Sequence, residues 1–331
     1  MAFVERISTA RGRGMPLPRL ERARIAILIP CYNEEAAIGN VVAGFRGALP
    51  GADIYVYDNN SRDRTAAIGA AAGAIVRREQ RQGKGHVVAR MFADIEADVY
   101  VLVDGDGTYD AAAAPALIDH LLEHRLDIVN GLRNGNHQRT GHRFGNDLFN
   151  RIVQWVFGSR FDDMLSGYKV LSRRFVKSFP ALATGFEIET ELTVHALRLR
   201  MPSAELPTAY GDRAEGSASK LRTVRDGIKI LWAIFLLIKG ERPLAFFTCG
   251  FAALAAMSVA LATPIAVTYL ETGLVPRLPT AVAAVGAMLL AFLSLSCGFV
   301  LDTVSRGRTE MKRLNYLSLP GPGNDTEAGR P

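Results

Sequence analysis

The 331-residue sequence contains only three cysteines, Cys31, Cys249 and Cys297. Their number and spacing give neither a disulfide framework nor a cysteine-based metal site. Zinc-finger spacing, a basic helix with heptads and an aromatic RNA-binding signature are also missing, so the net charge of +6 predicts no nucleic-acid partner. A surface that faces a membrane accounts for the basic charge more simply.

Charged residues nearly vanish between Pro243 and Leu301, where only Glu271 and Arg277 interrupt two apolar stretches. The stretches 244–270 and 280–301 are each long enough for a helix to cross a hydrocarbon core of about 30 Å. They predict two transmembrane helices within a region that covers 243–303. A buried helical hairpin of a globular protein is the alternative, which is disfavoured because core helices seldom run so long without charge.

Basic residues around these stretches predict their orientation. Arg242 precedes the first stretch, a basic tail over 304–331 follows the second, and the loop between them carries Arg277 as its one basic residue. Since basic residues are retained on the cytoplasmic side, both ends of the pair are expected there. The chain is therefore predicted to be an integral membrane protein whose larger domain lies at the cytoplasmic face of the bilayer.

Two further segments flank the larger domain. Residues 223–242 combine large apolar side chains with lysines, which predicts an amphipathic helix at the membrane interface, with a core helix as the alternative. Residues 1–23 are rich in arginine but have no long apolar run, so no secretory signal is expected there. This arm is predicted to be disordered, with contact to anionic lipid headgroups as the alternative.

Short β-branched runs alternate with alanine-rich stretches over the predicted domain 24–222. This alternation is typical of an α/β domain in which helices cover a mostly parallel sheet. The predicted strands cover 25–29, 54–58, 74–78, 99–103 and 127–131, and the predicted helices cover 35–48, 63–72, 85–96 and 114–124. Such sheets bind ligands where loops leave the carboxyl ends of the strands. Four unusually polar loops are therefore expected to converge on one edge, over 30–35, 58–61, 81–85 and 104–107.

Asp104 and Asp106 directly follow the fourth predicted strand. Two carboxylates in this position suit a hard divalent cation, Mg²⁺ or Mn²⁺, that keeps coordination positions for phosphate oxygens and water. Such an ion would neutralise a leaving diphosphate. An ordinary turn is the alternative for these residues taken alone.

The segment Gly83-Lys84-Gly85 opens a predicted helix. Glycines at a helix start let backbone N–H groups approach an anion, and the lysine adds a positive charge. A tight turn is an equal alternative, because the segment lacks the spacing of a Walker motif. In the loops nearby, Glu34 and Asp58 could accept hydrogen bonds from a nucleobase or ribose and Tyr32 could lie against the base, with helix capping and surface positions as the alternatives.

Together, these loops resemble the nucleotide-sugar domain of glycosyltransferase family 2, most closely its branch of dolichyl- and polyprenyl-phosphate sugar synthases. The resemblance covers about 24–231 and rests on the segments 29–35, 58–65, 83–85 and 104–106 in that order. It implies a GT-A-type, Rossmann-like domain that binds a nucleotide-sugar donor linked to UDP or GDP. It further implies a polyprenyl or dolichyl phosphate acceptor, Mg²⁺ or Mn²⁺ as cofactor, and inverting transfer of a single sugar.

The resemblance also implies roles for individual residues. Those implied to bind the nucleotide sugar are Pro30, Tyr32, Glu34, Asp58, Lys84, Asp104 and Arg133. Those implied to take part in catalysis are Asp106, Asp163, Arg139, Arg143, Arg213 and Lys220. Among these, Asp163 opens an Asp-x-x-Ser-Gly segment that looks like the floor of the sugar pocket.

The basic residues implied to act fall into two groups. Arg213 and Lys220 correspond to a mobile loop that grips phosphates, with solvated surface charge as the alternative. Arg133, Arg139 and Arg143 follow the fifth predicted strand and could flank the acceptor phosphate, with a disordered basic loop as the alternative.

Two positions depart from the family pattern. Thr108 stands where many relatives have a glutamine as a further metal ligand, and Lys169 stands where an arginine is common. Glu187 is the nearest candidate for a general base, but a phosphate monoester with a second pKa of about 6 is largely a dianion near neutral pH and needs none. We therefore interpret Glu187 as an organiser of the pocket.

Two other functions would share parts of this pattern. A processive membrane polysaccharide synthase would use the same donor loops, but the sequence has no Gln-x-x-Arg-Trp motif and two spans are few for a polymer channel. A non-catalytic sugar-nucleotide sensor or membrane scaffold would not need to keep Asp104, Asp106, Lys84 and Arg213 together. Two-span relatives can associate through their membrane helices, so a homo-oligomer is a further expectation.

Overall fold

The computed structural model of the chain describes residues 4–5, 23–134, 161, 163–185, 187–211, 239–240 and 242–322. Two compact units divide the chain, one formed by residues 1–224 together with 312–331 and the other by residues 225–311. A β-sheet with covering helices makes up most of the described part of the first unit. Two long helices make up most of the described part of the second.

One sheet contains the eight strands that the structure describes, in the order β1-β8-β6-β7-β5-β2-β3-β4. The strands are β1 (Val4–Glu5), β2 (Ile25–Cys31), β3 (Asp53–Asp58), β4 (Ile75–Arg78), β5 (Val99–Leu102), β6 (Ile128–Asn134), β7 (Lys169–Ser172) and β8 (Ser203–Ala209). Neighbouring strands are parallel except where β7 pairs with β5 and with β6. This topology confirms the predicted α/β class with a mostly parallel sheet.

Side chains of β2 alternate between two cores, as the geometry of a strand requires. Ile27 and Ile29 belong to the core on one face of the sheet, and Ala26 and Leu28 belong to the core on the other. Because both faces are covered, the strand is apolar at successive positions rather than at every second one.

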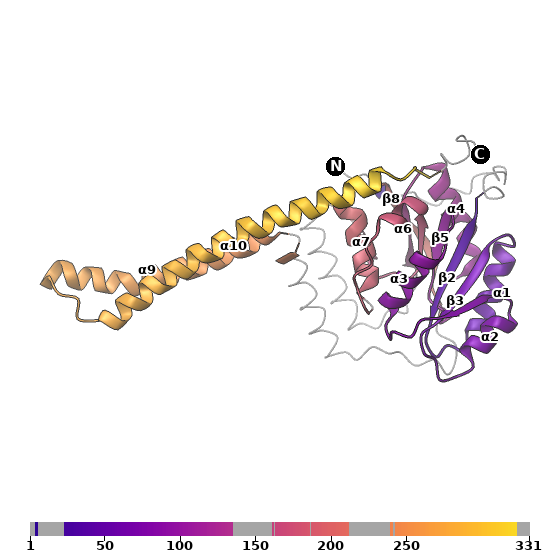
Figure 1. Cartoon of the computed structure of the whole chain (residues 1–331), viewed down its shortest axis with the longest axis horizontal. Helices are drawn as coiled ribbons and strands as arrows, with labels where there is room; N and C mark the ends of the chain where they lie inside the picture. The colour runs from indigo at the N-terminus through magenta and orange to yellow at the C-terminus, as the bar shows by residue number, and fades with distance from the viewer. Residues whose placement is uncertain are drawn as a thin grey trace. The chain divides into compact units, whose positions relative to one another are not determined.

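Helices from different parts of the chain cover the two faces. Those that pack on the first core are α1 (Ile38–Ala48), α2 (Thr65–Ala71) and α4 (Ala114–Glu123), the last preceded by the short helix η1 (Ala111–Ala113). Those that pack on the second core are α3 (Lys84–Asp94), α6 (Arg173–Ser178) and α7 (Ile188–Leu199). Figure 1 shows α3 and α7 on one side of β2 and β3, and α1 on the other.

The predicted elements up to β6 match observed ones, with ends that differ by at most three residues. Later elements, namely β7, α6, α7 and β8, were not predicted. The prediction of a disordered arm over 1–23 is wrong for Val4–Glu5, which pair with Ser203 and Ala204 of β8. Backbone pairing at the edge of the sheet therefore holds this short piece of the arm.

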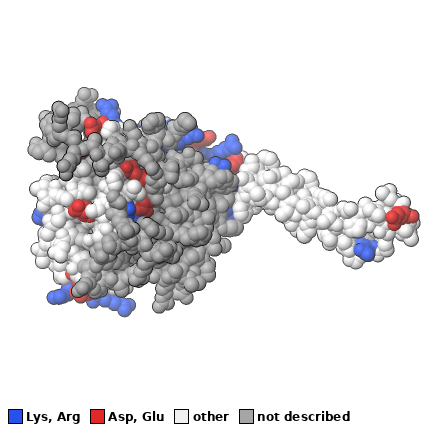
Figure 2. Space-filling view, turned by 180° about the vertical axis from the view of Figure 1, so that it is seen from behind, with Lys and Arg blue, Asp and Glu red and all other residues white. Residues whose placement is uncertain are grey.

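Two helices are long and apolar enough to cross a membrane, α9 (Pro243–Thr272) in the second unit and α10 (Leu278–Leu317), which belongs to that unit up to Met311. They include the two predicted apolar stretches. Side chains of one helix donate to backbone carbonyls of the other, Ser258 Oγ to Ala284 O at 2.7 Å and Ser294 Oγ to Phe247 O at 3.1 Å. Figure 2 shows that the surface along these helices is almost free of charged side chains, as expected for candidate membrane spans.

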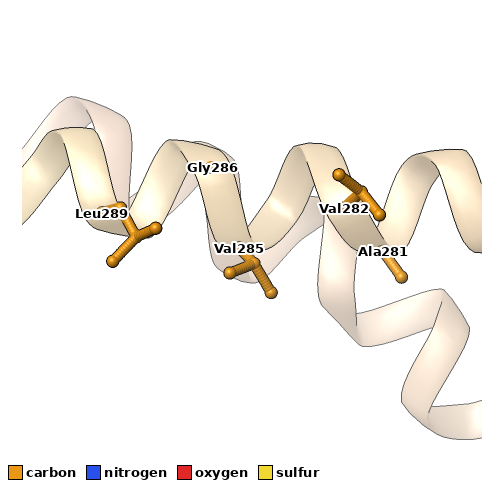
Figure 3. A pocket seen from close by; sticks show the side chains of 5 residues that line it. All are labelled: Ala281, Val282, Val285, Gly286 and Leu289. Atoms are coloured by element: carbon orange, nitrogen blue, oxygen red, sulfur yellow. The ribbon is translucent and has the colours of Figure 1, made fainter.

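An apolar pocket lies on α10 and is lined by Ala281, Val282, Val285, Gly286 and Leu289 (Figure 3). None of these side chains can donate or accept a hydrogen bond or carry a charge. This pocket therefore cannot provide the chemistry predicted from the polar loops, which belong to the sheet.

α10 runs into the segment over 304–331 that was predicted to be a basic cytoplasmic tail. The helix continues to Leu317, and residues from Lys312 onward belong to the same unit as the sheet. There the Tyr316 hydroxyl donates to Asp127 Oδ2 at 2.7 Å, and Arg174 lies over the Tyr316 ring at 4.3 Å. Residues 312–317 of the predicted tail are thus helical, and Tyr316 packs on the second core of the sheet domain.

Candidate functional site

Hydrogen bonds join the loops that follow β2 and β3. Asn33 has a left-handed backbone with φ of 53°, which asparagine tolerates better than most residues. Its N–H donates to Ser61 Oγ at 2.9 Å, and its Oδ1 accepts from Arg62 N at 2.8 Å. Glu34 N donates to Thr65 Oγ1 at 2.8 Å. These contacts fix the two loops side by side at the carboxyl ends of their strands.

The predicted nucleotide-binding residues of these loops lie at the same edge. Pro30 and Tyr32 are half-buried at the end of β2, whereas Glu34 and Asp58 are buried, with 8% and 6% exposed. Asp58 pairs in register with Cys31 of β2, and its Oδ1 accepts from Ser61 N at 3.2 Å. The structure thus brings these four residues together, and their nucleotide contacts stay predictions.

Asn59, which was not singled out from the sequence, connects the β3 loop to the loop after β4. Its Nδ2 donates to the carbonyl oxygens of Glu79 at 3.0 Å and Arg81 at 2.7 Å. Its Oδ1 accepts from Gly83 N at 2.7 Å. One buried amide therefore holds the start of α3 against β3.

Backbone from a distant part of the chain lies against both glycines of Gly83-Lys84-Gly85. A Cβ added at Gly83 would lie 2.1 Å from the carbonyl oxygen of Thr184, and one added at Gly85 would lie 2.1 Å from that of Ala183. No side chain fits in that space. The glycines make room for the backbone before α7, and their part in binding an anion stays a prediction.

Lys84 lies between two carboxylates that come from different elements. Its ammonium contacts Asp104 Oδ1, just after β5, and Glu189 Oε1, in the first turn of α7. Burial lowers the pKa of Lys84, but attraction to the two carboxylates outweighs this effect and the pKa is raised overall. The lysine is therefore positively charged at neutral pH.

Gly167 explains the glycine of the Asp-x-x-Ser-Gly segment. A Cβ there would lie 2.2 Å from Asp104 Oδ2, so only glycine lets that carboxylate take its place. Gly167 N donates to the Tyr109 hydroxyl at 2.8 Å, and Ser166 Oγ donates to the carbonyl oxygen of Gly131 at 2.6 Å. The segment is thereby fixed against the loop after β5.

Asp106 is 4% exposed, and its Oδ1 accepts from the backbone N of Thr108 at 3.1 Å and from Thr108 Oγ1 at 2.6 Å. Thr108 thus orients one of the two predicted metal ligands. Among the described residues, no group of three or more His, Cys, Asp or Glu side chains could hold a metal ion. Two aspartates still fit a Mg²⁺-like ion, which commonly takes one or two carboxylates and completes its shell with substrate phosphates and water.

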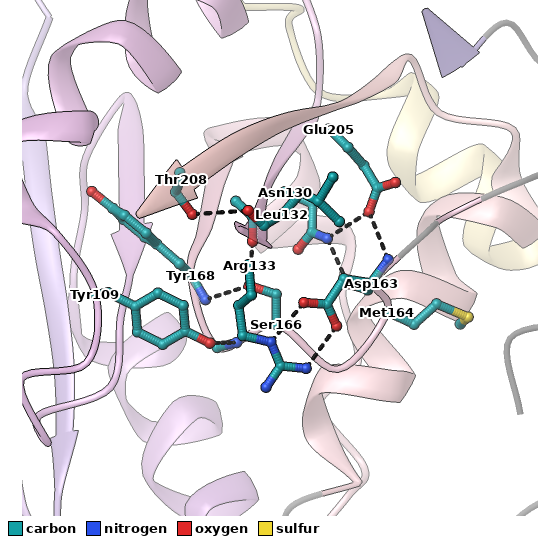
Figure 4. Close-up of polar contacts among 12 residues, drawn as sticks. Tyr109, Asn130, Leu132, Arg133, Asp163, Met164, Ser166, Tyr168, Glu205 and Thr208 are labelled. Atoms are coloured by element: carbon teal, nitrogen blue, oxygen red, sulfur yellow. Dashed lines mark hydrogen bonds and ion pairs between the residues drawn. The ribbon is translucent and has the colours of Figure 1, made fainter. Parts of the chain in front are cut away.

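Arg133, near the end of β6, and Asp163, in the loop before β7, form a bidentate ion pair (Figure 4). The distances are 2.6 Å from Nε to Oδ2 and 2.7 Å from Nη2 to Oδ1. Burial lowers the pKa of Arg133, but the bonds to Asp163 outweigh it and raise the pKa overall. Asn130 Nδ2 donates to Asp163 O at 2.6 Å, and Glu205 Oε1 accepts from Asp163 N at 3.2 Å. This network fixes the pair in one orientation.

Lys169, the second departure from the family pattern, is fully buried. Its Nζ donates to Asn130 Oδ1 at 2.7 Å and to Thr193 Oγ1 at 3.3 Å. Burial lowers the pKa of Lys169 to about 8, against the pull of Asp163 and Glu189. Through Asn130, the buried lysine supports the hydrogen-bond network of Asp163 from inside the protein.

Comparisons with known proteins show the family of this chain. The family described as "Glycosyl transferase family 2" matches residues 26–177. Glycosyltransferase AglJ of Haloferax volcanii is 31% identical over 300 residues, which cover 88% of this chain and 98% of that protein. The chain belongs to glycosyltransferase family 2. It is thus a glycosyltransferase, as the order of its loops predicted.

Two other similar proteins bear on the branch and the fold of this glycosyltransferase. A protein of H. volcanii named dolichyl-phosphate hexose transferase is 29% identical over 194 residues, 57% of this chain and 84% of that protein. Its name agrees with the predicted lipid-phosphate branch. Glucosyl-3-phosphoglycerate synthase from Mycobacterium tuberculosis, solved with Mn²⁺, UDP and glucosyl-3-phosphoglycerate, covers 70% of this chain and 86% of its own, with TM-score 0.56 and 22% identity. That likeness shows the GT-A-type fold.

The structure describes some of the predicted site residues of this glycosyltransferase and not others. Arg139, Arg143, Arg213 and Lys220 lie outside the described residues. Glu187 is exposed just before α7, whereas Glu189, two residues later, is the carboxylate that contacts Lys84. Sequence reasoning missed Glu189, although a carboxylate among the buried positions Ile188, Leu192 and Ala196 of one helix is an unusual feature.

Proposed function

We propose that this enzyme transfers one sugar from a UDP- or GDP-linked donor to a polyprenyl or dolichyl phosphate at the cytoplasmic face of a membrane. One observation carries the proposal. The same chain contains a glycosyltransferase family 2 domain and two candidate membrane spans. An acceptor with a polyprenyl tail lies in the bilayer, so an enzyme with its own spans is kept near its substrate. The name of the dolichyl-phosphate hexose transferase supports the acceptor class.

On the donor side, the ends of β2 and β3 supply the groups for the nucleoside. The carboxylates of Glu34 and Asp58 would accept hydrogen bonds from base or ribose, and Tyr32 would lie against the base. Lys84, at the start of α3, would lie beside the diphosphate together with Asp104 and Asp106. A Mg²⁺ or Mn²⁺ ion bound by these two aspartates would neutralise the charge that develops on the leaving group. The Mn²⁺ and UDP bound in the solved synthase complex support this assignment.

On the acceptor side, the ion pair of Arg133 and Asp163 supports an electrostatic role. Nε and Nη2 of Arg133 both donate to Asp163, so the guanidinium is held in a fixed plane, and 19% of the side chain remains exposed. An arginine held in this way can present its remaining N–H groups to a phosphate without reorganising. Arg139 and Arg143 would add charge beside it, and Arg213 and Lys220 would bind donor phosphates.

The reaction would be an in-line displacement at the anomeric carbon. An oxygen of the acceptor phosphate forms the new bond as the bond to the nucleoside diphosphate breaks, and the configuration inverts. The dianionic acceptor has no proton to lose, so no general base is needed. Asp163 suits this scheme because its carboxylate already accepts two hydrogen bonds from Arg133. Its role would be to position Arg133 and form the floor of the sugar pocket.

The test is a transfer assay with the full-length protein. Purified protein is incubated with polyprenyl phosphate, Mg²⁺ or Mn²⁺ and a panel of UDP- and GDP-sugars, and lipid products are analysed by mass spectrometry. We expect a single lipid-linked sugar from one donor, and loss of that product in Asp104→Asn. Asp53→Asn, at the exposed start of β3, is the matched control and should remain active.

Two outcomes would contradict the proposal. Addition of many sugars to one acceptor would indicate a processive polysaccharide synthase. Transfer to a soluble sugar or glycerate acceptor, with none to any lipid phosphate, would refute the acceptor class. For the orientation, cleavage of the loop at Arg277 by protease added only on the cytoplasmic side would exclude the proposed topology.

A further inference from the structure

Lys84 neutralises the carboxylate of Asp104 from inside the protein. Its side chain is 9% exposed, and its ammonium contacts Asp104 and Glu189. An ammonium has three donors on a flexible stem, so it can keep one of these partners while it leaves the other. The ammonium of Lys84 thus balances the negative charge of Asp104, the proposed metal ligand.

The two carboxylates differ in access to solvent. The side chain of Asp104 is 30% exposed, whereas that of Glu189 is 8% exposed. Oδ2 of Asp104 lies against Gly167, and its Oδ1 contacts Lys84. A cation that arrives from solvent can therefore reach the carboxylate of Asp104, whereas the carboxylate of Glu189 is accessible mainly to Lys84.

We propose that Lys84 competes with the divalent cation for Asp104, and that Glu189 is the positioning residue that keeps Lys84 when Asp104 is given to the metal. This inference rests on the proposed function, because it takes Asp104 as a metal ligand. It adds that the site has two charge arrangements. Lys84 bridges both carboxylates before the donor binds, and afterwards Glu189 is the one of the two carboxylates that it contacts.

Competition predicts effects of opposite sign for the two ends of the Lys84–Glu189 pair. Without the lysine, no internal cation holds Asp104, so a metal ion should bind more tightly to the nucleotide-free protein. Without the charge of Glu189, Asp104 is the one carboxylate of this pair left to Lys84, so the lysine should hold it more firmly and metal binding should weaken. If the two residues only stabilised the fold, both substitutions would weaken metal binding.

The experiment measures Mn²⁺ binding to the full-length protein without nucleotide, by the electron paramagnetic resonance signal of free Mn²⁺. We expect Lys84→Met to bind Mn²⁺ about tenfold more tightly than the wild type and Glu189→Gln to bind it about tenfold more weakly. The double variant Lys84→Met/Glu189→Gln leaves no unpaired buried charge and should also bind more tightly. Its result keeps the test decisive if Lys84→Met does not fold.

Lys177→Met is the matched control, because Lys177 is also largely buried and pairs with Glu96 at 2.7 Å rather than with Asp104. Its Mn²⁺ affinity should equal that of the wild type. Unchanged or weaker binding in both variants that lack Lys84 would overturn the inference. A lipid-linked product together with unshifted Mn²⁺ affinities would sink the competition alone. Shifted affinities without any lipid product would sink the proposed acceptor and leave the competition standing.

Discussion

Adding one methyl group at Gly167 should impair catalysis without unfolding the enzyme. In Gly167→Ala the new Cβ would lie 2.2 Å from Asp104 Oδ2 and 2.8 Å from Asp104 Cγ. Ordinary contact needs a separation more than 1 Å greater, so the carboxylate has to move by about 1 Å. The side chain of Asp104 is 30% exposed and has room to do so. A displacement of this size in a site of this kind lowers the rate about 100-fold.

Stability should change little in the same variant. Gly167 has no left-handed backbone that would exclude alanine. Replacing glycine at a compatible position stabilises a protein by about 0.4–1 kcal/mol through the unfolded chain, which offsets part of the lost contact between Asp104 and Lys84. The assay is the rate of glycosyl transfer, with thermal unfolding measured on the same samples.

Gly51→Ala is the control, since no atom lies within 4 Å of a Cβ added there. It should match the wild type in both measurements. A transfer rate within twofold of the wild type in Gly167→Ala would refute the reasoning, because Asp104 could then move without consequence. If the transfer rate of Gly167→Ala falls only as far as its lower unfolding temperature explains, the glycine is needed for stability rather than for placing Asp104.

Two further predictions concern side chains in the second core of the sheet domain. Burial lowers the pKa of His195 to about 3, with smaller effects of the same sign from Lys312 and Arg198. As the pH falls below about 6.5, His195 therefore binds a proton in the unfolded chain but not in the folded chain. The free energy of unfolding should fall by about 2–3 kcal/mol between pH 6.5 and 4.5. Denaturant unfolding at several pH values should show this slope in the wild type and a flatter one in His195→Gln; equal slopes would contradict the assignment. Tyr316→Phe removes the hydroxyl that donates to buried Asp127 at 2.7 Å and should lower the free energy of unfolding by about 2 kcal/mol. The control Tyr269→Phe changes a side chain that is 54% exposed, and an equal loss in both variants would contradict the prediction.

The parts of the fold that the sequence predicts are those with a simple apolar pattern. β2 and β5 are buried on both faces, so each is a short continuous run of apolar residues that ends in a polar loop. β8 has no such pattern, because it contains Glu205 and Pro207, which strands seldom hold. Its position between β6 and β1 arises from pairing with strands far away in the sequence.

The convergence of the site loops on one edge of the sheet could be predicted, but the contacts between the loops could not. Lys84 and Glu189 are 105 residues apart, and their contact exists because α3 and α7 pack on the same face of the sheet. Likewise, the clash at Gly167 depends on Asp104, and the clash at Gly83 depends on Thr184. A glycine in a motif indicates close approach, while the fold determines what approaches.

The paired charges at this sheet edge predict which substrate rearranges the enzyme. Arg133 is held by Asp163 through two bonds, and Asp163 is held in turn by Asn130 and Glu205. A phosphate can therefore bind to the outer edge of the guanidinium without breaking these bonds. Lys84 differs, because a cation at Asp104 displaces one of its two partners. We therefore expect donor and metal binding to change the enzyme, and acceptor binding to use a site that is already built.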